Sequence, residues 1–460
     1  MEKLPNDIEA LKEIIRQLLE RIRCLEAENA ELRRRLGMDS TNSHNPPSSE
    51  GYRKKTTQPG LPKKKGQGKG GQKGHKGKTL ERVEKPAHVE MHLPKQCECC
   101  GRQFGTEEEY EIIQSRPVFD LPEPKLEVTE HRLGQITCGE KEQKGEYPTE
   151  VKTPVQYGAG VRALIVMLSV DCKMPLEQIS QCFADIFGYK LNSQTILEVL
   201  ERGYELSAPL EEQIKAALKS SEVAHFDETG IRAEGKLYWL HTASNEENTH
   251  LFIHPKRGTE ALNSEESVLP DFRGTAVHDC WSPYFTFNQV KHALCGAHLL
   301  RELKGLIEEG SLWAFEMHEF LLDVYNMPNP VVAEEELRKH YQIILEHAEQ
   351  EELPPQQGKR GRPKKSRGRN LLDRLRTYQD SVLAFAFEVG VPFTNNQAER
   401  DLRPSKVKLK ICGGFRTVEG GVVYARIQAL ISTLRKRGMN VFAQLRDLFS
   451  LRLSKLAYAG

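Results

Sequence analysis

The sequence predicts a multidomain α+β protein. Three observations lead to this class: a heptad repeat over the first 36 residues, a run of helices between residues 158 and 218, and a strand-rich stretch that begins at Ser221. The 460 residues allow two to four domains. Only 38% of them are hydrophobic and 28% are charged, so we also expect extended or disordered segments.

Charge and hydropathy exclude two protein classes. The net charge is +1, so any surface for a polyanion must come from local clusters of basic residues. The longest strongly apolar run, residues 163–170, is far shorter than the ~20 residues of a membrane span, and the N-terminus has no apolar signal core. Ten cysteines do not make a disulfide scaffold. We therefore expect a cytosolic protein rather than a membrane or secreted one.

Residues 1–38 are predicted to form a parallel coiled coil that makes the protein a homo-oligomer. Isoleucine or leucine recurs every seven residues along two seams, and Asn29 interrupts one seam, as expected for a residue that fixes register. The alternative is a single amphipathic helix packed on its own domain.

Residues 39–85 are predicted to be a disordered basic linker. Residues 51–78 contain ten Lys or Arg, eight Gly and no acidic residue, which prevents a core and favours contact with phosphates. Lys63, Lys64 and Lys65 are candidate DNA contacts within it. The alternative is a solubilising linker.

Residues 86–150 are predicted to be a zinc-ribbon-like module. Cys97 and Cys100 form a C-x-x-C pair, and Cys138 follows a strand-like stretch. Two such pairs hold zinc tetrahedrally, but Lys141 replaces the fourth cysteine. Cys99 or His131 can supply that ligand, so a ribbon that keeps zinc and one that has lost it both stay open.

Residues 155–218 are predicted to be helical and to contain a helix-turn-helix. Residues 160–172 and 176–187 form two helices, and a turn containing Gly188 leads to a third helix, capped by Ser193 and running through Leu206. Ser193, Gln194 and Thr195 would then face base edges. An ordinary helical bundle is the alternative.

Residues 219–311 are predicted to hold the first part of a ribonuclease H-like core. Short strands at residues 223–227, 237–243 and 251–254 are followed by a helix at residues 259–268 and a strand at residues 275–279. Asp227 and Asp279 each end a strand. Where neighbouring parallel strands end together, such side chains meet at one sheet edge.

Glu399 is the predicted third acid, in the last part of the core at residues 390–435. Thr394 or Asn395 can cap a helix there, and Pro404 is expected to end it. Carboxylates suit Mg²⁺ or Mn²⁺, and two such ions promote in-line phosphoryl transfer. Glu228 and Asp401 are competing acids, but each should face away from the predicted site.

These segments together resemble the insertion sequence 66 family of bacterial transposases. The resemblance rests on residues 226–230 (FDETG), 278–284 (HDCWSPY), 295–302 (CGAHLLRE) and 394–404 (TNNQAERDLRP), with further matches at 413–416 and 420–421. It implies a DDE transposase in which Asp227, Asp279 and Glu399 are the catalytic, magnesium-binding triad. The family also suggests accessory proteins of the same element.

Residues 312–389 are predicted to be a helical insertion with a basic loop. Seven of the eleven residues from 359 to 369 are basic. Arg360 and Arg362 belong to a core that resembles an AT-hook, and the alternative is a loop that touches only phosphates. Arg400 and Arg403 extend the basic surface beside Glu399. Cys295 and His298 read as an interior pair rather than a zinc site.

The leading functional hypothesis is a metal-dependent DNA transposase of the bacterial nucleoid, with residues 436–460 as a helical tail. It would bind element ends, cleave them and join their 3′-hydroxyls to target DNA. One alternative is a catalytically inactive DNA-binding regulator on the same scaffold. The other is a nuclease that only hydrolyses DNA.

Overall fold

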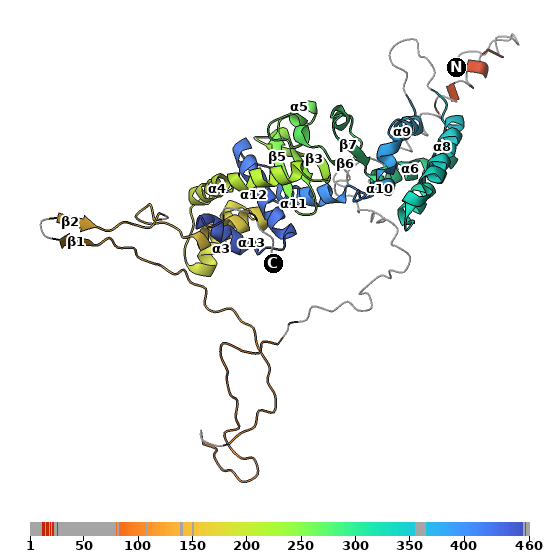
Figure 1. The fold of residues 1–460 in the computed structure, drawn as a ribbon. Helices are drawn as coiled ribbons and strands as arrows, with labels where there is room; N and C mark the ends of the chain where they lie inside the picture. Colours follow the sequence, from red (N-terminus) through yellow and green to blue (C-terminus); the bar gives the residue numbers. More distant parts are fainter. Residues whose placement is uncertain are drawn as a thin grey trace, which may run out of the picture.

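The computed structural model describes residues 80, 82–105, 109–138, 141–149, 151–354, 365–453 and 456, with nine helical positions between residues 12 and 25 (Figure 1). Most of the predicted coiled coil, the basic linker with Lys63, Lys64 and Lys65, and the loop with Arg360 and Arg362 lie outside the described residues. Those predictions therefore stay predictions.

A five-stranded mixed sheet forms the centre of the fold, with the strand order β5-β4-β3-β6-β7. Its strands are β3 (Val223–Ala233), β4 (Lys236–Ser244), β5 (Thr249–His254), β6 (Thr275–His278) and β7 (Lys291–Leu294). Strands β3, β4 and β5 pair antiparallel, whereas β6 and β7 run parallel to β3. The sequence had indicated only four strands, because β7 is short and half polar.

Helices cover both faces of this sheet. On one face, Ile214 and Leu218 of helix α4 (Ser193–Lys219) pack against Phe226 of β3. On the other face, helices α11 (Asn396–Cys412) and α12 (Val418–Lys436) lie over β3, β4 and β5. Because side chains alternate along a strand, Phe226 and Asp227 face opposite layers, and Asp227 lies on the side of α11.

A helical unit adjoins the sheet through α12. It contains α2 (Ala159–Val166), α3 (Leu176–Phe187), α4 (Ser193–Lys219) and α13 (Val441–Phe449), which share one core with α12. Two details of the prediction were wrong. Asn192 rather than Ser193 caps α4, since its side chain accepts a hydrogen bond from the backbone of Gln194, and α4 continues past Leu206 and through Pro209 to Lys219.

A second helical unit follows the sheet and corresponds to the predicted insertion. It packs around Trp313, Met317 and Tyr341, and Figure 1 shows it on one side of the sheet. Its helices are α6 (Gly296–Glu308), α7 (Leu312–Asn326), α8 (Glu334–Glu351), α9 (Arg367–Thr377) and α10 (Gln379–Phe387). Helix α10 returns against β7 and leads the chain back to α11.

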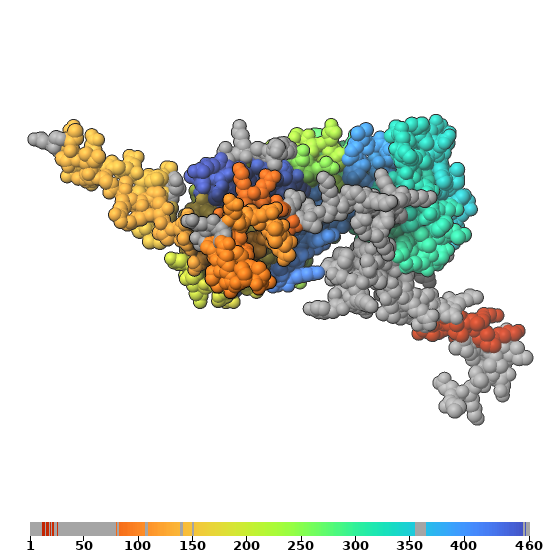
Figure 2. All heavy atoms as spheres, turned by 90° about the horizontal axis from the view of Figure 1, so that it is seen from below, coloured from red at the N-terminus to blue at the C-terminus, as the bar shows by residue number. Residues whose placement is uncertain are grey.

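The described residues between 82 and 157 form an extended arm on the N-terminal side of the helical unit. The arm carries a turn at residues 96–103 and the hairpin β1–β2 (Gln135–Cys138 and Lys141–Lys144), and Figure 2 shows the hairpin end projecting from the body. Among the described residues, no helix combines the length and the apolar character needed to cross a bilayer.

Candidate active site

Asp227 and Asp279 occupy equivalent positions on two neighbouring parallel strands. The parallel pairing of β3 with β6 ends where His225 lies opposite Val277, and each aspartate lies two residues further along its own chain. Asp227 is not at the end of its strand as predicted, because β3 continues to Ala233 in antiparallel pairing with β4. The prediction that the two acids meet requires only that β3 and β6 pair in parallel up to His225 and Val277, and this pairing is present.

The two aspartates interact electrostatically. Removal from water and the negative charges of Glu228 and Asp279 raise the pKa of the half-buried Asp227 carboxyl well above its ordinary value. Backbone N–H groups hold both carboxyls: that of Glu228 donates to Asp227 at 2.9 Å, and that of Trp281 donates to Asp279 at 3.0 Å. Concentrated negative charge of this kind suits a divalent cation.

Glu399 comes to the same face of the sheet from α11. It lies in the first turn of this helix, which packs against β3 and β4, and its charge contributes to the raised pKa of the nearby Cys295 thiol. Pro404 does not end the helix as predicted. The helix runs on to Cys412 and ends at Gly413, whose φ of 73° is left-handed.

The three carboxyl groups are not tightly gathered. In the described part of the chain, only Cys97, Cys99 and Cys100 place three metal-ligand atoms within 4.8 Å of one another. Asp227, Asp279 and Glu399 therefore stand further apart than the ligands of a single ion. Two ions about 3.5–4 Å apart spread their ligands over a wider area, and a set of carboxylate oxygens fits Mg²⁺ or Mn²⁺.

The competing acid Glu228 is paired with other side chains, although its negative charge contributes to the raised pKa of Asp227. Its buried carboxylate pairs with Arg257 at 2.6 Å and accepts a hydrogen bond from the Tyr284 hydroxyl at 2.7 Å. The Arg257 guanidinium also lies over the rings of Trp239 and Trp281. Glu228 thus points to the opposite face of β3 from Asp227, as the alternation of the strand predicts.

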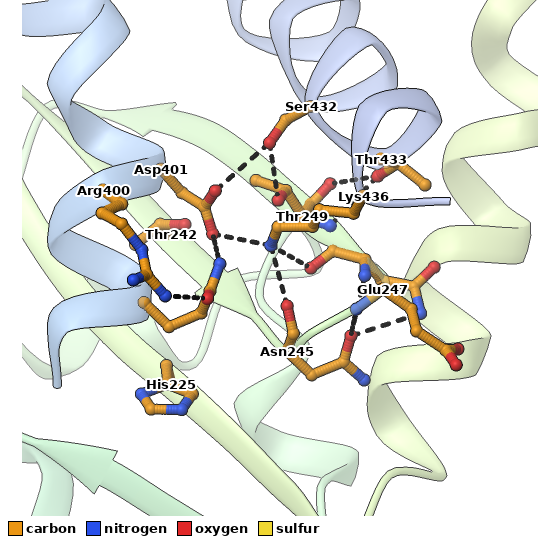
Figure 3. Close-up of polar contacts among 12 residues, drawn as sticks. His225, Thr242, Asn245, Glu247, Thr249, Arg400, Asp401, Ser432, Thr433 and Lys436 are labelled. Carbon is orange, nitrogen blue, oxygen red and sulfur yellow. Dashed lines mark hydrogen bonds and ion pairs between the residues drawn. The ribbon is translucent and has the colours of Figure 1, made fainter. Parts of the chain in front are cut away.

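The other competing acid, Asp401, is also paired. Its buried carboxylate accepts a hydrogen bond from the Lys436 ammonium of α12 at 2.7 Å (Figure 3). This pair occupies Asp401, so Glu399 is the remaining acid of α11.

A comparison with known families covers the part of the chain that contains the sheet and these acids. The family model described as "Transposase IS66 family" matches residues 154–423, which is more than half of the chain. The chain belongs to the IS66 transposase family. This IS66-family chain also matches a model described as "Family of unknown function (DUF6444)" over residues 2–81. No curated protein matches it.

Membership of the IS66 transposases implies a DNA-cleaving enzyme and therefore a DNA-binding surface. Ser193 and Gln194 are exposed at the start of α4, Thr195 is half-buried there, and Arg400 and Arg403 are exposed on α11. The positive charge of Lys406 is close enough to Asp227 to oppose part of the rise in its pKa. Lys408, by contrast, turns inward to the carbonyl oxygens of Ser169 and Met174.

The described end of the basic loop is occupied by ion pairs within the IS66-family chain. Lys365 pairs with Asp373, and Arg367 pairs with Glu309. Arg369 pairs with Glu349 and Asp373. DNA contact by this loop is therefore a prediction for Arg360 and Arg362 rather than for its last residues.

The cysteines of the arm are grouped differently from the predicted zinc ribbon, which combined Cys97 and Cys100 with Cys138. The Gly101 N–H donates to the Cys97 carbonyl at 3.0 Å, which closes a tight turn that gathers Cys97, Cys99 and Cys100. Cys138 lies on β1 and is not in this group. The hydrogen bond from Cys99 lowers the pKa of the Cys97 thiol to about 7, so this sulfur is a ready ligand for a soft metal ion.

Proposed function

We propose that this protein is a DDE-type DNA transposase that cleaves the ends of its element and joins their 3′-hydroxyls to target DNA. The observation that carries the proposal is the equivalent placement of Asp227 and Asp279 on β3 and β6, with Glu399 brought to the same face by α11. The order of the five strands supports a ribonuclease H-like core. Family membership supports the activity.

We assign Asp227, Asp279 and Glu399 as the residues that would hold two divalent cations, with Asp227 as a ligand shared by both. Such ions would supply Lewis-acid chemistry for in-line transfer, by activating the attacking hydroxyl and stabilising the leaving oxygen. The residues of the chain hold and orient this centre: backbone N–H groups fix the Asp227 and Asp279 carboxyls, and Lys406 partly balances the charge of Asp227. Arg400 and Arg403, exposed beside Glu399, would contact the DNA backbone.

DNA recognition is assigned to the parts of the chain around this core. The exposed start of α4, with Ser193 and Gln194, would read the element end, and the cysteine module and basic segments would add contacts. The coiled coil would join copies of the chain so that two ends are held together. Such a protein would act on the nucleoid, with accessory proteins of its element where these are required.

A strand-cleavage assay tests the proposal. The DNA is a labelled fragment carrying one of the inverted repeats that flank the coding region, and the reaction is started with Mg²⁺. We expect Asp227→Asn, Asp279→Asn and Glu399→Gln to bind this DNA like the unaltered protein but to make neither nicks nor joined products. Full activity in any of the three would remove that residue from the mechanism.

The same assay separates the alternatives. An unaltered protein that binds the end fragment and never cuts it would be an inactive regulator. A protein that nicks DNA without forming joined products would be a hydrolytic nuclease.

A further inference from the structure

Helix α11, which carries Glu399, is attached to the rest of the core by buried polar side chains on either side of this residue. We propose that Asn395 and Asp401 are positioning residues that set where Glu399 stands relative to Asp227 and Asp279. The inference rests on the proposed function, since it concerns the third acid of the same centre. It adds two residues that do not touch the reacting atoms.

The first attachment is Asn395, directly before α11. Its amide group donates to the Phe226 carbonyl of β3 at 2.8 Å, and its amide oxygen lies 2.9 Å from His225 Nδ1. Its own backbone N–H donates to the sulfur of Cys295, at the start of α6, at 3.1 Å. Only 2% of Asn395 is exposed, and its three partners are buried as well. Asn395 therefore joins α11 to β3 directly beside Asp227.

The direction of these hydrogen bonds is determined by the chemistry of the groups. The Asn395 amide nitrogen is already donating to the Phe226 carbonyl, so the amide oxygen must accept from His225 Nδ1. The ring of His225 therefore carries its proton on Nδ1. The Cys295 thiol, which the sequence placed in an interior pair, is likewise an acceptor in this attachment.

Asn395 does not cap the helix that follows it. An asparagine before a helix normally accepts a hydrogen bond from the first turn, as Asn192 and Asn440 do in this chain. Within the described structure, Asn395 makes no such capping bond to α11. Helix stability alone would favour the cap. The observed arrangement instead favours a fixed position of α11 against β3.

The second attachment is Asp401, two residues after Glu399. Besides Lys436, its carboxylate accepts from the Ser432 hydroxyl at 3.2 Å (Figure 3). Lys436 also donates to the backbone carbonyls of Asn245 at 2.8 Å and Asn248 at 3.0 Å, in the turn between β4 and β5. Asp401 therefore ties α11 to α12 and to the sheet. A buried ion pair seldom stabilises a fold more than apolar residues of the same size do, so its role here is one of placement.

The two attachments lie before and after Glu399 along the chain. Asn395 and Glu399 are four residues apart and so lie on one side of the helix, while Asp401 projects from another side. With both held, α11 can neither turn about its axis nor slide along β3 without breaking buried hydrogen bonds. A metal centre needs its ligands within about 0.5 Å of the productive arrangement, and two attachments give the helix that precision.

The test measures Mn²⁺ binding to the full-length protein by electron paramagnetic resonance, together with its melting temperature. The main variant is Asn395→Ser, because serine caps a helix well but is too short to reach β3. We expect Asn395→Ser to fold and to bind Mn²⁺ about tenfold or more weakly, as for other residues that orient metal ligands. Its control is Asn440→Ala, which removes a helix cap far from the centre and should leave Mn²⁺ affinity unchanged.

A second variant addresses Asp401 without leaving a buried charge unpaired. Asp401→Leu combined with Lys436→Met removes the whole pair, and we expect a folded protein with Mn²⁺ affinity reduced about tenfold. The control is Glu211→Leu combined with Arg426→Met, which removes another buried pair on α12. Mn²⁺ affinity within twofold of the unaltered protein in both Asn395→Ser and the Asp401 double variant would overturn the inference.

Asp227→Asn separates this inference from the proposed function. If that variant binds Mn²⁺ as the unaltered protein does, the proposed metal centre itself is wrong. If Asp227→Asn abolishes binding while the Asn395 and Asp401 variants bind normally, only the positioning role fails.

Discussion

Asp279 raises the pKa of Asp227 across a pair of parallel strands. The negative charge of Asp279 makes the charged form of Asp227 less favourable, and this effect adds to the larger one of burial. The folded protein therefore holds a proton on Asp227 at a pH where the unfolded chain has released it. Such a site is destabilising by itself, as expected for one built to bind cations.

The first prediction concerns stability without metal. Because the raised pKa of Asp227 makes the folded state bind its proton more tightly, stability falls as the pH rises from about 4 towards the raised value. Asp227→Asn removes this loss, so in EDTA at pH 8 we expect its melting temperature to be higher by about 2–5 °C. Calorimetry at pH 8 and pH 5 checks this, and the difference should shrink at pH 5. A variant that melts lower at pH 8 would contradict the interpretation.

The second prediction separates Glu228 from the metal-binding acids. Glu228→Gln breaks the pair with Arg257 but keeps an acceptor for Tyr284, so we expect a loss of about 1–3 kcal/mol in the free energy of unfolding. Mg²⁺-dependent cleavage should stay within about tenfold of the unaltered protein, since Glu228 faces the other layer. Urea unfolding and the cleavage assay measure the two effects. Complete loss of cleavage in a folded variant would make Glu228 a ligand.

The third prediction concerns acid stability. His241 and His250 are buried on either side of the Phe252 ring, and burial lowers the pKa of each to about 4. A lowered histidine pKa gives stability that is present above pH 6.5 and is lost as the pH falls towards 4. For each ring we expect the free energy of unfolding to fall by about 2 kcal/mol between pH 8 and pH 5.

Unfolding in urea at several pH values measures this loss. His241→Gln should reduce the pH dependence, whereas His347→Gln, at an exposed position of α8, should leave it unchanged. Equal pH profiles for His241→Gln and the unaltered protein would show that burial of this ring is not the source.

The fourth prediction concerns the basic surface of α11. Arg400 and Arg403 are exposed beside Glu399, so each should release about one counterion when it contacts a phosphate. Changing either to glutamine should weaken binding to all DNA sequences alike and reduce the slope of log K against log salt by about one. Fluorescence anisotropy from 50 to 200 mM salt measures the slope. Lys339→Gln, on the exposed face of α8, is the control, and an unchanged slope in both arginine variants would rule out α11 as a contact.

The fifth prediction concerns the cysteine turn. With its thiol pKa lowered to about 7, Cys97 should bind zinc as a thiolate at pH 8. We expect one zinc ion per chain by native mass spectrometry and none in Cys97→Ser, while Cys412→Ser, at an exposed cysteine of α11, keeps it. Loss of zinc in Cys138→Ser would add that residue as a ligand from β1. A chain that takes up no zinc would identify a ribbon that has lost its metal.

Some parts of the fold followed from local sequence patterns. The βββ hairpins and the helical insertion were predictable because apolar residues recur there with strand or helix spacing. The opposite directions of Asp227 and Glu228 follow from the two-residue period of a strand alone.

Other parts depended on contacts between distant residues. β3 runs past Thr229 and Gly230 because β4 pairs with it from His225 to Ala233. The local strand preference of these residues does not indicate this pairing. The partners of Asp401 and Asn395 lie on other elements of the chain, so local patterns did not indicate Lys436 or His225 as their partners. The role of Arg257 was not predicted for the same reason, although its partner Trp281, two residues after Asp279, belongs to a motif that the sequence shows.

Helix α12 belongs to two hydrophobic cores at once. Its Tyr424, Ile427 and Ile431 complete the core of the helical unit, while Ala425 and Ala429 pack on the sheet. The start of α4 is thus connected through α12 to the sheet that carries Asp227. If α4 binds the element end, the protein sets the number of base pairs between the recognised sequence and the cleaved bond. Inserting one base pair between these two points would then move the cleavage site by one base pair.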